Sequence, residues 1–505
     1  MNNYKDKILP IAIKVSYVLT VLATAGLMFK VAGLNMLPTK FLVPVVVFVV
    51  LVLLAIGVML FRTPKKIGSK KVLRAIALVL SIVIIVADVV GLNMIGKFEQ
   101  TMSDFIEDDV KVEEFVFGVY VRAADKAENL EDVKRHDFGY SLAFDRNNTK
   151  TAIDTIESEL DRNLDMTEYD AVPEMVDAVL SGEKDAFILN VSYMDILLEQ
   201  EGYEDLLDKI KCVHECVVTS ETKVVGKDDE SFDITKDPFI VYLSGHDTRK
   251  AASRANSDVN ILAVVNPSTK QVLLLNTPRD FYIPISVSDS GALDKLTHCG
   301  VHGVECSMDT LNEYYDIDIR YYAQVNFNGF VRLVDAIGGI TVYSEKEFIS
   351  TSEGVHIQQG INHLDGEAAL EFVRERKQFG AGDHARGRHQ MAVIKGIMER
   401  ASSGTTLLSN YSEILASMGG YFRCNLEQEE ISSLVKMQLN DMAQWNIQTY
   451  AVSGSGSKDY CYSMKGLKTY VMIPDETTVD HAKILIKMVY DGETIEEEDL
   501  KVPVK

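Results

Sequence analysis

The segment LNTPRD at residues 275–280 ends an apolar run and presents Arg279 beside Asp280. Residues 259–265 and 271–275 are both apolar and are separated by NPSTK, a turn-forming segment, so they predict an antiparallel hairpin. A strand end that offers a guanidinium suits a phosphorylated ligand, because the planar fork can bind two phosphate oxygens at once. Taken alone, residues 278–280 are more typical of a surface ion pair, so their interpretation depends on the rest of the chain.

The composition limits the class of protein. At 505 residues the chain is long enough for several domains. Its charge is uneven: residues 1–99 carry +9 and the remaining residues carry −32, which gives the net charge of −23. Nucleic acid is therefore not an expected partner, because binding to its phosphate backbone requires a basic surface.

Three apolar runs open the chain, at residues 8–29, 41–61 and 72–95. Each is close to the ~20 residues that cross a ~30 Å hydrocarbon core, so we predict three transmembrane helices and not a cleaved signal peptide. The loop between the second and third runs is short and strongly basic, which places it in the cytoplasm. The N-terminus is then cytoplasmic, and the chain after residue 96 is extracellular. Lys14 can extend to the interface, whereas Asp88 is expected to face a neighbouring helix or the interface.

Residues 100–235 are predicted to form an extracellular accessory domain of mixed α and β structure. Strand patterns occur at residues 115–121 and 185–190, and helical spacing occurs at 151–164 and 172–180. The run AVPEMVDAVLSGEKDAFILN resembles a helix, glycine turn and strand of extracellular solute-binding proteins, but no ligand-binding constellation accompanies it. The charged, turn-rich residues 223–237 are predicted to be a linker.

Strands and helices alternate irregularly after residue 236. The predicted strands are at residues 239–243, 259–265, 271–275, 321–325 and 340–343, and the predicted helices are at 307–315, 327–336, 366–376 and 384–402. This mixture predicts an α/β sandwich at residues 236–405, a catalytic domain in which helices cover a central sheet. Residues 406–505 are predicted to be a C-terminal part with a strand at 445–452, a turn at 454–456 and a solvated acidic tail at 491–499.

Two aspartates flank the first two strands of the predicted catalytic domain. Asp247 follows the first strand within SGHDTR, and Asp258 precedes the second. If these strands are neighbours, both carboxylates lie at one edge of the sheet, where oxygen ligands with open water positions suit Mg²⁺ bound to a phosphate. Each aspartate taken singly is more typical of a turn or cap.

Basic residues cluster between two predicted helices. Arg374 and Arg376 end the first helix, while Arg386 and Gln390, four residues apart, share a face of the second. The glycine-rich loop FGAGD between them can let the arginines close around an anion. A solvated helix face is the alternative, but a concentration of arginines in a region of net charge −32 indicates a basic site.

All six cysteines lie beyond residue 200, which is compatible with disulfides in an extracellular region. A zinc site is less favoured, because no Cys-x-x-Cys pair recurs at zinc-finger spacing. The sequence does not fix the connectivity. Proximity along the chain suggests the pairs Cys212 with Cys216, Cys299 with Cys306, and Cys424 with Cys461.

Taken in order, the motifs resemble a known family. SGHDTR, NSD at 256–258, NTPRD at 276–280, LVDAIGGITV at 333–342, ALEFVRER and GDHARGRHQ are together similar to the LytR-CpsA-Psr family of Gram-positive cell envelopes. The three-helix anchor and the accessory domain are similar to its capsule-attaching members. The resemblance implies an extracellular, Mg²⁺-assisted phosphotransferase. Such enzymes move a glycopolymer, such as capsular polysaccharide or teichoic acid, from a polyprenyl pyrophosphate carrier to peptidoglycan and attach it through a phosphodiester.

The resemblance also implies roles for individual residues. Asp247 and Asp258 correspond to carboxylates near the metal, and Asp383 is a candidate to orient or deprotonate the acceptor hydroxyl, acting with Arg279 and Arg386 in catalysis. The residues implied in pyrophosphate binding are Arg249, Arg254, Arg279, Arg374, Arg376, Arg386 and Gln390. An apolar slot for the lipid tail is expected from Phe330, Val331, Val334, Leu370 and Phe372, for which ordinary core packing is at least as good an explanation.

One position departs from the family pattern. Asn256 stands where the family often has an arginine, and Arg249 or Arg254 can supply that charge. Two alternatives use the same site: a polyprenyl pyrophosphate phosphatase, with water as the acceptor, and a lipid-binding regulator without turnover, of the transcriptional-attenuator type. The regulator predicts a cytoplasmic output module, whereas only short termini and one basic loop are predicted inside the cell.

Overall fold

A computed structural model describes most of the chain. The described residues are 2–61, 67–106, 110–143, 145–223, 231–246, 255–288, 290–376, 378–379, 382–403, 414 and 419–502. The chain divides into two compact units. One comprises residues 1–106, 402–419 and 426–444, and the other comprises residues 107–401, 420–425 and 445–505.

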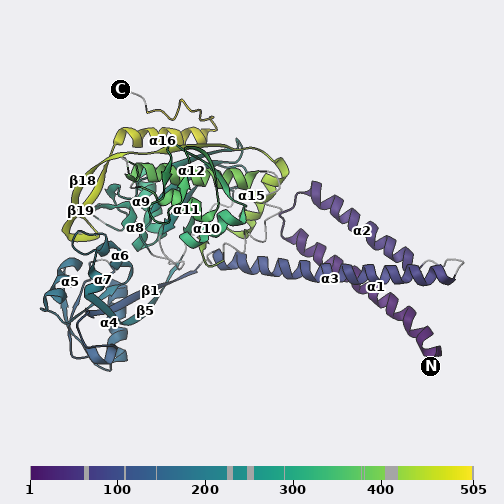
Figure 1. Cartoon of the computed structure of the whole chain (residues 1–505), viewed down its shortest axis with the longest axis horizontal. Coiled ribbons are helices and arrows are strands. Elements are labelled where there is room, and N and C mark those ends of the chain that lie inside the picture. Colours follow the sequence, from purple (N-terminus) through teal and green to yellow (C-terminus); the bar gives the residue numbers. More distant parts are fainter. Residues whose placement is uncertain are drawn as a thin grey trace. The chain divides into compact units, whose positions relative to one another are not determined.

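Long apolar helices dominate the first unit, drawn from purple to blue in Figure 1. They are α1 (Asn2–Gly33), α2 (Thr39–Phe61) and α3 (Ile67–Phe105), and a shorter helix, α15 (Gln428–Asp441), belongs to the same unit. Within the described residues, three helices are long and apolar enough to cross a membrane, as the sequence predicts. Asp88 of α3 is buried and accepts a 2.6 Å hydrogen bond from Thr24 of α1, so it faces a neighbouring helix. Residues 62–66 of the predicted cytoplasmic loop lie outside the described residues.

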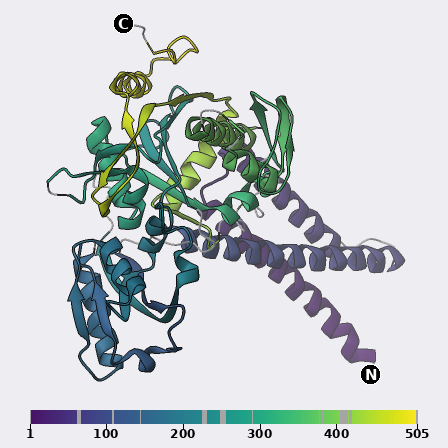
Figure 2. The same ribbon diagram turned by 60° about the vertical axis from the view of Figure 1, so that its left-hand side comes forward.

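Residues 110–223, the predicted accessory domain, contain a mixed sheet. Its described strands follow the order β3-β2-β4-β1-β5, and Figure 2 shows the domain in blue. The strands are β1 (Val110–Arg122), β2 (Asp137–Tyr140), β3 (Asp165–Glu168), β4 (Ala186–Asn190) and β5 (Ile210–Lys223), and the helices are η1 (Leu130–Val133), α4 (Arg146–Glu159), α5 (Val172–Ser181), α6 (Ser192–Leu198) and α7 (Leu206–Lys209). Helix α5 ends at Gly182, whose φ of 85° is a conformation that glycine adopts without steric cost. Residues 224–230 of the predicted linker lie outside the described residues.

The main sheet of the second unit has, in the described residues, the strand order β16-β11-β6-β7-β8-β17. The strands are β6 (Phe239–His246), β7 (Val259–Asn266), β8 (Gln271–Asn276), β11 (Tyr321–Asn326), β16 (Phe422–Cys424) and β17 (Asn446–Ala451). The predicted antiparallel hairpin is confirmed, because β7 pairs with β8 from Asn266 opposite Gln271 onward. Strands β16 and β17 come from the segment predicted as a separate C-terminal part, so that segment completes this sheet.

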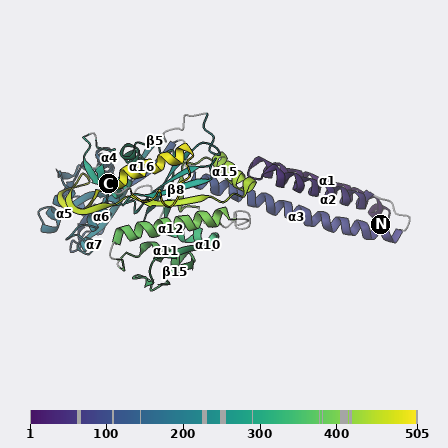
Figure 3. The same cartoon turned by 90° about the horizontal axis from the view of Figure 1, so that it is seen from above.

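Helices cover the main sheet on both faces, which confirms the predicted α/β fold. They are α8 (Leu296–His302), α9 (Val304–Tyr315), α10 (Phe327–Ala336), α11 (Gly366–Arg374), α12 (Gly382–Ser402) and α16 (Glu476–Asp491). On one face, Leu311 of α9 and Leu485 of α16 share a core with Tyr242, Leu262 and Leu273 of the strands. Figure 3 shows α16 and α12 on opposite sides of β8. Burial on both faces explains why β8 is apolar along nearly its whole length.

In the described part of this unit, four two-stranded antiparallel sheets lie outside the main sheet and the five-stranded sheet. They pair β9 (Tyr282–Pro284) with β10 (Leu293–Lys295), β12 (Ile340–Ser344) with β15 (Gly360–Leu364), β13 (Phe348–Ile349) with β14 (His356–Ile357), and β18 (Gly454–Cys461) with β19 (Met464–Pro474). The last of these corrects a prediction, because residues 454–456 begin a strand and are not a turn. A Cβ atom on Gly454 would lie 2.4 Å from the carbonyl oxygen of Ile473, so this glycine permits close strand pairing.

The acidic tail is also not wholly solvated. Ile495 within it is fully buried in the core beneath the main sheet. Its carbonyl oxygen accepts a 3.2 Å hydrogen bond from Asn446 Nδ2 at the start of β17. The prediction of a solvated or mobile segment at residues 491–499 is therefore wrong for its middle, where one apolar side chain anchors the tail.

The suggested disulfides are not formed, because all six cysteines are free. Cys212 and Cys216 lie on the single strand β5, where four residues span about 13 Å, and a disulfide requires Cα atoms about 4.4–6.8 Å apart. Cys424 lies on an edge strand of the main sheet, whereas Cys461 ends β18 of a separate hairpin. Cys299 and Cys306 are both buried thiols, the first 3.5 Å from Thr310 Oγ1 and the second 3.7 Å from Ser286 Oγ.

An aromatic cluster beside α12 buries a histidine. The ring of His389 lies 4.3 Å from that of Phe372 and 4.8 Å from that of Phe379, measured between centroids. Burial lowers the pKa of His389 to about 4, so its imidazole is neutral at pH 7. The unfolded chain binds this proton from about pH 6.5 downward. The folded state therefore loses stability as the pH falls from 6.5 towards 4.

We expect His389→Phe to reduce this loss, because phenylalanine fills the aromatic site and cannot take up a proton. Between pH 7 and 4.5, the unfolding free energy of the wild type should fall by about 2–3 kcal/mol more than that of the variant. Denaturant unfolding of the full-length protein, followed by circular dichroism at each pH, measures the difference. The exposed His363→Gln is the control and should behave as wild type. Parallel pH curves for wild type and His389→Phe would contradict this assignment.

Candidate functional site

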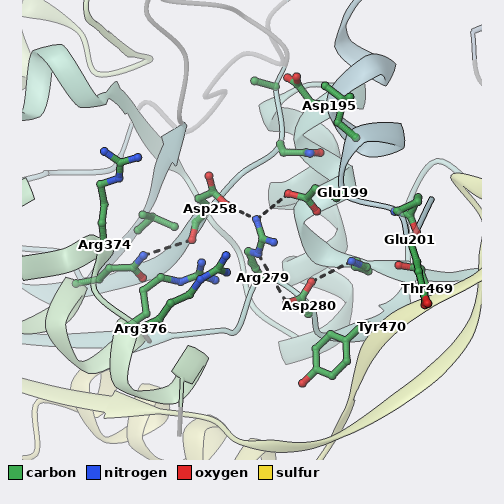
Figure 4. A pocket seen from close by; sticks show the side chains of 18 of the residues that line it. Asp195, Glu199, Glu201, Asp258, Arg279, Asp280, Arg374, Arg376, Thr469 and Tyr470 are labelled. Carbon is green, nitrogen blue, oxygen red and sulfur yellow. Dashed lines mark hydrogen bonds and ion pairs between the residues drawn. The ribbon is translucent and has the colours of Figure 1, made fainter. Parts of the chain in front are cut away.

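A cavity of about 790 Å³ lies at one edge of the main sheet. It brings together predicted residues that are far apart in the sequence (Figure 4). Those that line it are Asp258, Arg279, Arg374, Arg376, Arg386 and Gln390. Asp247, Arg249 and Arg254 lie outside the described residues. Asp383 is in the first turn of α12, and its side chain is likewise outside the described part of the chain.

Strand pairing explains why Asp258 and Arg279 meet. The end of β6 lies beside the start of β7, where Gly245 pairs with Val259 and the backbone N–H of Asp258 donates to the carbonyl of Gly245 at 2.9 Å. Because β7 and β8 are antiparallel, the end of β8 returns to the same edge. The chain turns after β8 and presents Arg279 next to Asp258, so the sheet topology builds this corner of the site.

The guanidinium of Arg279 lies among three carboxylates, as Figure 4 shows. Its Nη1 donates to Asp258 Oδ1 at 2.5 Å and to Glu199 Oε1 at 3.1 Å, and its Nε lies 3.7 Å from Asp280 Oδ2. Burial alone would lower the pKa of Arg279, but Asp258, Glu199 and Asp280 together raise it above its usual value. The arginine is therefore permanently charged and held on several sides.

Asp280 and Lys295 form a buried pair beneath Arg279. Lys295 Nζ lies 3.2 Å from Asp280 Oδ1, and both side chains are almost inaccessible to solvent. Burial raises the pKa of Asp280, but Lys295 and Arg279 outweigh it and keep that pKa below its ordinary value. Asp280 is thus a charged support for Arg279. The neighbouring carboxylate of Asp294 accepts hydrogen bonds from the backbone N–H groups of Lys295 and Ser463, both at 2.7 Å, which fixes this segment against the turn after β18.

Arginines from two helices form the opposite wall. Arg374 ends α11, and its guanidinium lies 5.1 Å from the ring centroid of Phe327. Arg376 follows two residues later, and Arg386 lies in α12. All three line the cavity together with Arg279, so several guanidinium groups share it. Such an arrangement suits a ligand with adjacent phosphates, since each guanidinium can bind two oxygens.

Three polar residues complete the sheet edge. Gln390 Nε2 lies 3.4 Å from the carbonyl oxygen of Asp258, which ties α12 to the start of β7. Asn256 lines the cavity, and its buried Oδ1 has no hydrogen-bond partner in the described structure. His246, at the end of β6, is buried, and this burial lowers its pKa to about 4, so it adds no positive charge at neutral pH.

The structure adds residues that the sequence analysis missed. Asp195 lies within α6, and Glu199 and Glu201 follow that helix, while Lys458, Lys468 and Tyr470 come from the β18–β19 hairpin. Short acidic runs recur along this chain, so the one that includes Glu199 carries no distinguishing signal. Lys295 directly follows Asp294 in the mixed segment ALDKLTH, so it carries no distinguishing signal either. The residues expected to line a lipid slot do not line this cavity, and Val334, Leu370 and Phe372 are buried in the core.

Comparison with known proteins identifies the family. The model of the LytR_cpsA_psr family matches residues 210–481, which is more than half of the chain. The chain belongs to the LytR_cpsA_psr family. The match to the family includes Asp258 and the four arginines that line the cavity, whereas Asp195, Glu199 and Glu201 precede it.

The chain has a similar sequence identity to several named transferases. The chain is 32% identical over 248 residues to the polyisoprenyl-teichoic acid–peptidoglycan teichoic acid transferase TagU of Oceanobacillus iheyensis, covering 48% of this chain and 73% of that protein. It is 31% identical over 245 residues to the TagU of Bacillus cereus strain AH820, covering 48% and 77%. Among solved structures, TagV of B. subtilis is 24% identical with a TM-score of 0.44, covering 52% of this chain and 99% of that one.

Proposed function

We propose that this protein transfers an anionic glycopolymer, such as teichoic acid or capsular polysaccharide, from a polyprenyl pyrophosphate carrier to peptidoglycan. The convergence of Arg279, Arg374, Arg376 and Arg386 on one cavity carries the proposal. A pyrophosphate diester presents two adjacent anionic phosphates, and the several guanidinium groups of this cavity match them. The transferase names of the family members named above support the same class of reaction.

The proposed reaction replaces one phosphate ester bond by another. The acceptor hydroxyl of peptidoglycan attacks the phosphorus that bears the glycopolymer, and the bond from that phosphorus to the bridging oxygen breaks. Polyprenyl phosphate leaves with the bridging oxygen and its electron pair, and the product is a phosphodiester. Phosphoryl transfer depends mainly on positioning and charge neutralisation. Arg279 and the arginines of α11 and α12 supply both, and Asp383 is the candidate to accept the hydroxyl proton.

The residues present fit a divalent cation. Asp258 offers a hard carboxylate oxygen to the cavity, and Asn256 adds an unpartnered amide oxygen beside it. We propose that Asp258 and Asp247 hold Mg²⁺ next to the pyrophosphate. When bound, the ion neutralises negative charge on the phosphate oxygens. The arginines hold those oxygens independently, so the chain contributes most of the neutralising charge itself.

The membrane helices suit a lipid-linked donor. The basic loop between α2 and α3 supports a topology with a cytoplasmic N-terminus and an extracellular catalytic domain. In this arrangement the polyprenyl chain of the donor stays in the same bilayer as the anchor. The leaving polyprenyl phosphate also returns to that bilayer, so the anchor keeps enzyme and carrier at one surface.

Asp258→Asn tests the proposed site directly. With full-length protein, Mg²⁺, a polyprenyl pyrophosphate saccharide and a peptidoglycan fragment, we expect transfer to fall about 10- to 100-fold. The Mg²⁺ concentration that gives half-maximal rate should rise, because an amide is a weaker ligand than a carboxylate. Mass spectrometry detects the phosphodiester product. Asp480→Asn, on the exposed side of α16, is the matched control.

The same assay separates the alternatives. Release of the saccharide phosphate without linkage to peptidoglycan would indicate a phosphatase with water as the acceptor. Binding of the lipid without any product would favour the regulator. Equal turnover by wild type and Asp258→Asn at every Mg²⁺ concentration would refute the assignment of Asp258.

A further inference from the structure

The accessory domain contributes a carboxylate to the cavity of the catalytic domain. Glu199 follows the last residue of α6, and its Oε1 accepts a 3.1 Å hydrogen bond from Arg279 Nη1. The same nitrogen contacts Asp258, so one guanidinium nitrogen serves a carboxylate from each domain. Figure 4 shows Glu199 on the side of Arg279 away from Arg374 and Arg376. Glu199 lies before residues 210–481, which match the family model, so it belongs to a part of the chain that the family model does not cover.

The position of Glu199 is fixed by packing. Ile196 and Leu197 of α6 are fully buried in a core that also contains Val301 of α8 and Val471 of β19. This core therefore spans the accessory and catalytic domains. Helix α6 packs against α8, and the backbone N–H of Thr297 in α8 donates to the carbonyl of Arg279 at 2.8 Å. The contacts from α6 to α8, and from Thr297 to Arg279, therefore fix the positions of Glu199 and Arg279 relative to each other.

Local electrostatics disfavour a carboxylate at this position unless a cation accompanies it. Glu199 is at the C-terminal end of α6, where the helix dipole repels negative charge. Its neighbour Glu201 has a separate partner, since Lys458 Nζ lies 3.1 Å from it. The carboxylates of Asp258, Asp280 and Glu199 all lie close to Arg279, and the positive charges near them are those of Arg279, Lys295 and Arg386. An anion that binds Arg279 must therefore compete with carboxylates that already neutralise its guanidinium.

We propose that Glu199 is an exchangeable counter-ion of Arg279 and sets the affinity of the cavity for pyrophosphate. While no anion is bound, Glu199 neutralises Arg279 and keeps its guanidinium directed into the cavity. A phosphate oxygen that binds Arg279 takes the place of Glu199, whose carboxylate turns away from the incoming charge. Donor binding is thereby coupled to the end of α6 in the accessory domain. This proposal rests on the proposed function, because it assigns pyrophosphate to the same arginine.

The test compares the binding of inorganic pyrophosphate to full-length variants in detergent micelles, by isothermal titration calorimetry with and without Mg²⁺. Glu199→Gln keeps the shape and the hydrogen-bond acceptor but removes the charge. We expect it to bind pyrophosphate about 5-fold more tightly than wild type without Mg²⁺. Glu201→Gln is the matched control and should bind as wild type. In wild type, pyrophosphate should also speed amide hydrogen exchange at residues 196–200, and in Glu199→Gln it should not.

The outcomes separate this proposal from the one on which it rests. If wild type binds through Arg279 and Glu199→Gln binds no more tightly, Glu199 is not a competing counter-ion and the inference is wrong. Weaker binding by Glu199→Gln would also refute it, because the carboxylate would then assist the anion. If no variant binds pyrophosphate, the pocket assignment itself fails and the inference fails with it. Binding by Glu199→Gln alone would support both.

Discussion

Replacing Arg279 by alanine should lower the rate of glycopolymer transfer by about 100- to 1000-fold, the range seen when a preorganised charge donor is removed from an active site. Arg279 follows the end of β8 and lines the cavity. Charged hydrogen bonds to Asp258 and Glu199 orient its side chain. Its loss removes one wall of the pyrophosphate pocket. It also leaves Asp258 and Glu199 without the cation that they share, and these two carboxylates then disfavour the anionic donor.

The measurement is the phosphodiester assay with a peptidoglycan acceptor, run at saturating donor and at low donor. The main loss should appear in kcat/KM, because Arg279 contacts the donor in both the ground and transition states. Arg332→Ala, an exposed arginine of α10 that packs on Tyr421, is the control and should retain wild-type activity. Undiminished transfer by Arg279→Ala would remove the central residue of the proposed site.

Loss of folding must be distinguished from loss of function in this experiment. Breaking a buried ion pair by removing one partner costs about 3–5 kcal/mol, and Asp280 remains buried beneath the vacated position. Arg279→Lys retains the positive charge but not the planar fork. It should therefore fold normally and still transfer at least 10-fold more slowly than wild type. A thermal unfolding midpoint close to that of wild type, together with low activity, would place the effect in the site.

Gly300→Ala should damage both the fold and the site. Gly300 lies in α8, where alanine would ordinarily gain about 1 kcal/mol from helix propensity. Here, however, an added Cβ would lie 2.2 Å from the carbonyl oxygen of Ala255 and 3.0 Å from the backbone nitrogen of Ser257. These are backbone atoms of the segment that leads into Asp258, so the collision cannot be relieved by a side-chain rotation. The steric cost, about 3 kcal/mol, exceeds the gain.

We expect Gly300→Ala to lose about 2 kcal/mol of stability and more than 10-fold in transfer rate, because Asp258 and Asn256 move with the displaced segment. Denaturant unfolding and the transfer assay measure the two effects. Gly96→Ala is the control: this glycine is also helical, and nothing lies within 4 Å of its added Cβ. A Gly300→Ala protein as stable and as active as wild type would mean that the segment before Asp258 is not fixed by α8.

Much of the fold could be predicted because local pattern and burial agree. Strands β7 and β8 are apolar runs divided by an asparagine-proline turn, and the structure pairs them as that pattern predicts. The helices α9 to α12 also follow their apolar periodicity. The motifs of the site could be found because Arg279 follows a strand and further arginines cluster between two predicted helices. Their shared cavity follows from β-strand geometry, since the ends of β6 and β8 and the start of β7 lie at one edge.

The remainder depends on long-range contacts that leave no local pattern. Residues 454–456 are two glycines around a serine, which predicts a turn, and only the pairing of β18 with β19 makes them the start of a strand. Glu199 has no motif because its contact with Arg279 depends on packing between α6 and α8, which are distant in sequence. Cysteine proximity was misleading for Cys212 and Cys216, because an extended strand separates residues that are close in sequence.

The parallel pairing of β8 with β17 has a consequence for biogenesis. Gln271 is joined to Asn446 across a separation of 175 residues. On the proposed topology, translocation brings out β8 well before its partner. At a synthesis rate of about 5–20 residues per second, one edge of β8 stays unpaired for roughly 10–30 s before β17 is made. During that interval a strand that is buried throughout in the finished sheet has one unsatisfied edge, which favours aggregation. On the proposed topology, the time that β17 takes to emerge therefore determines how long β8 can associate with other chains.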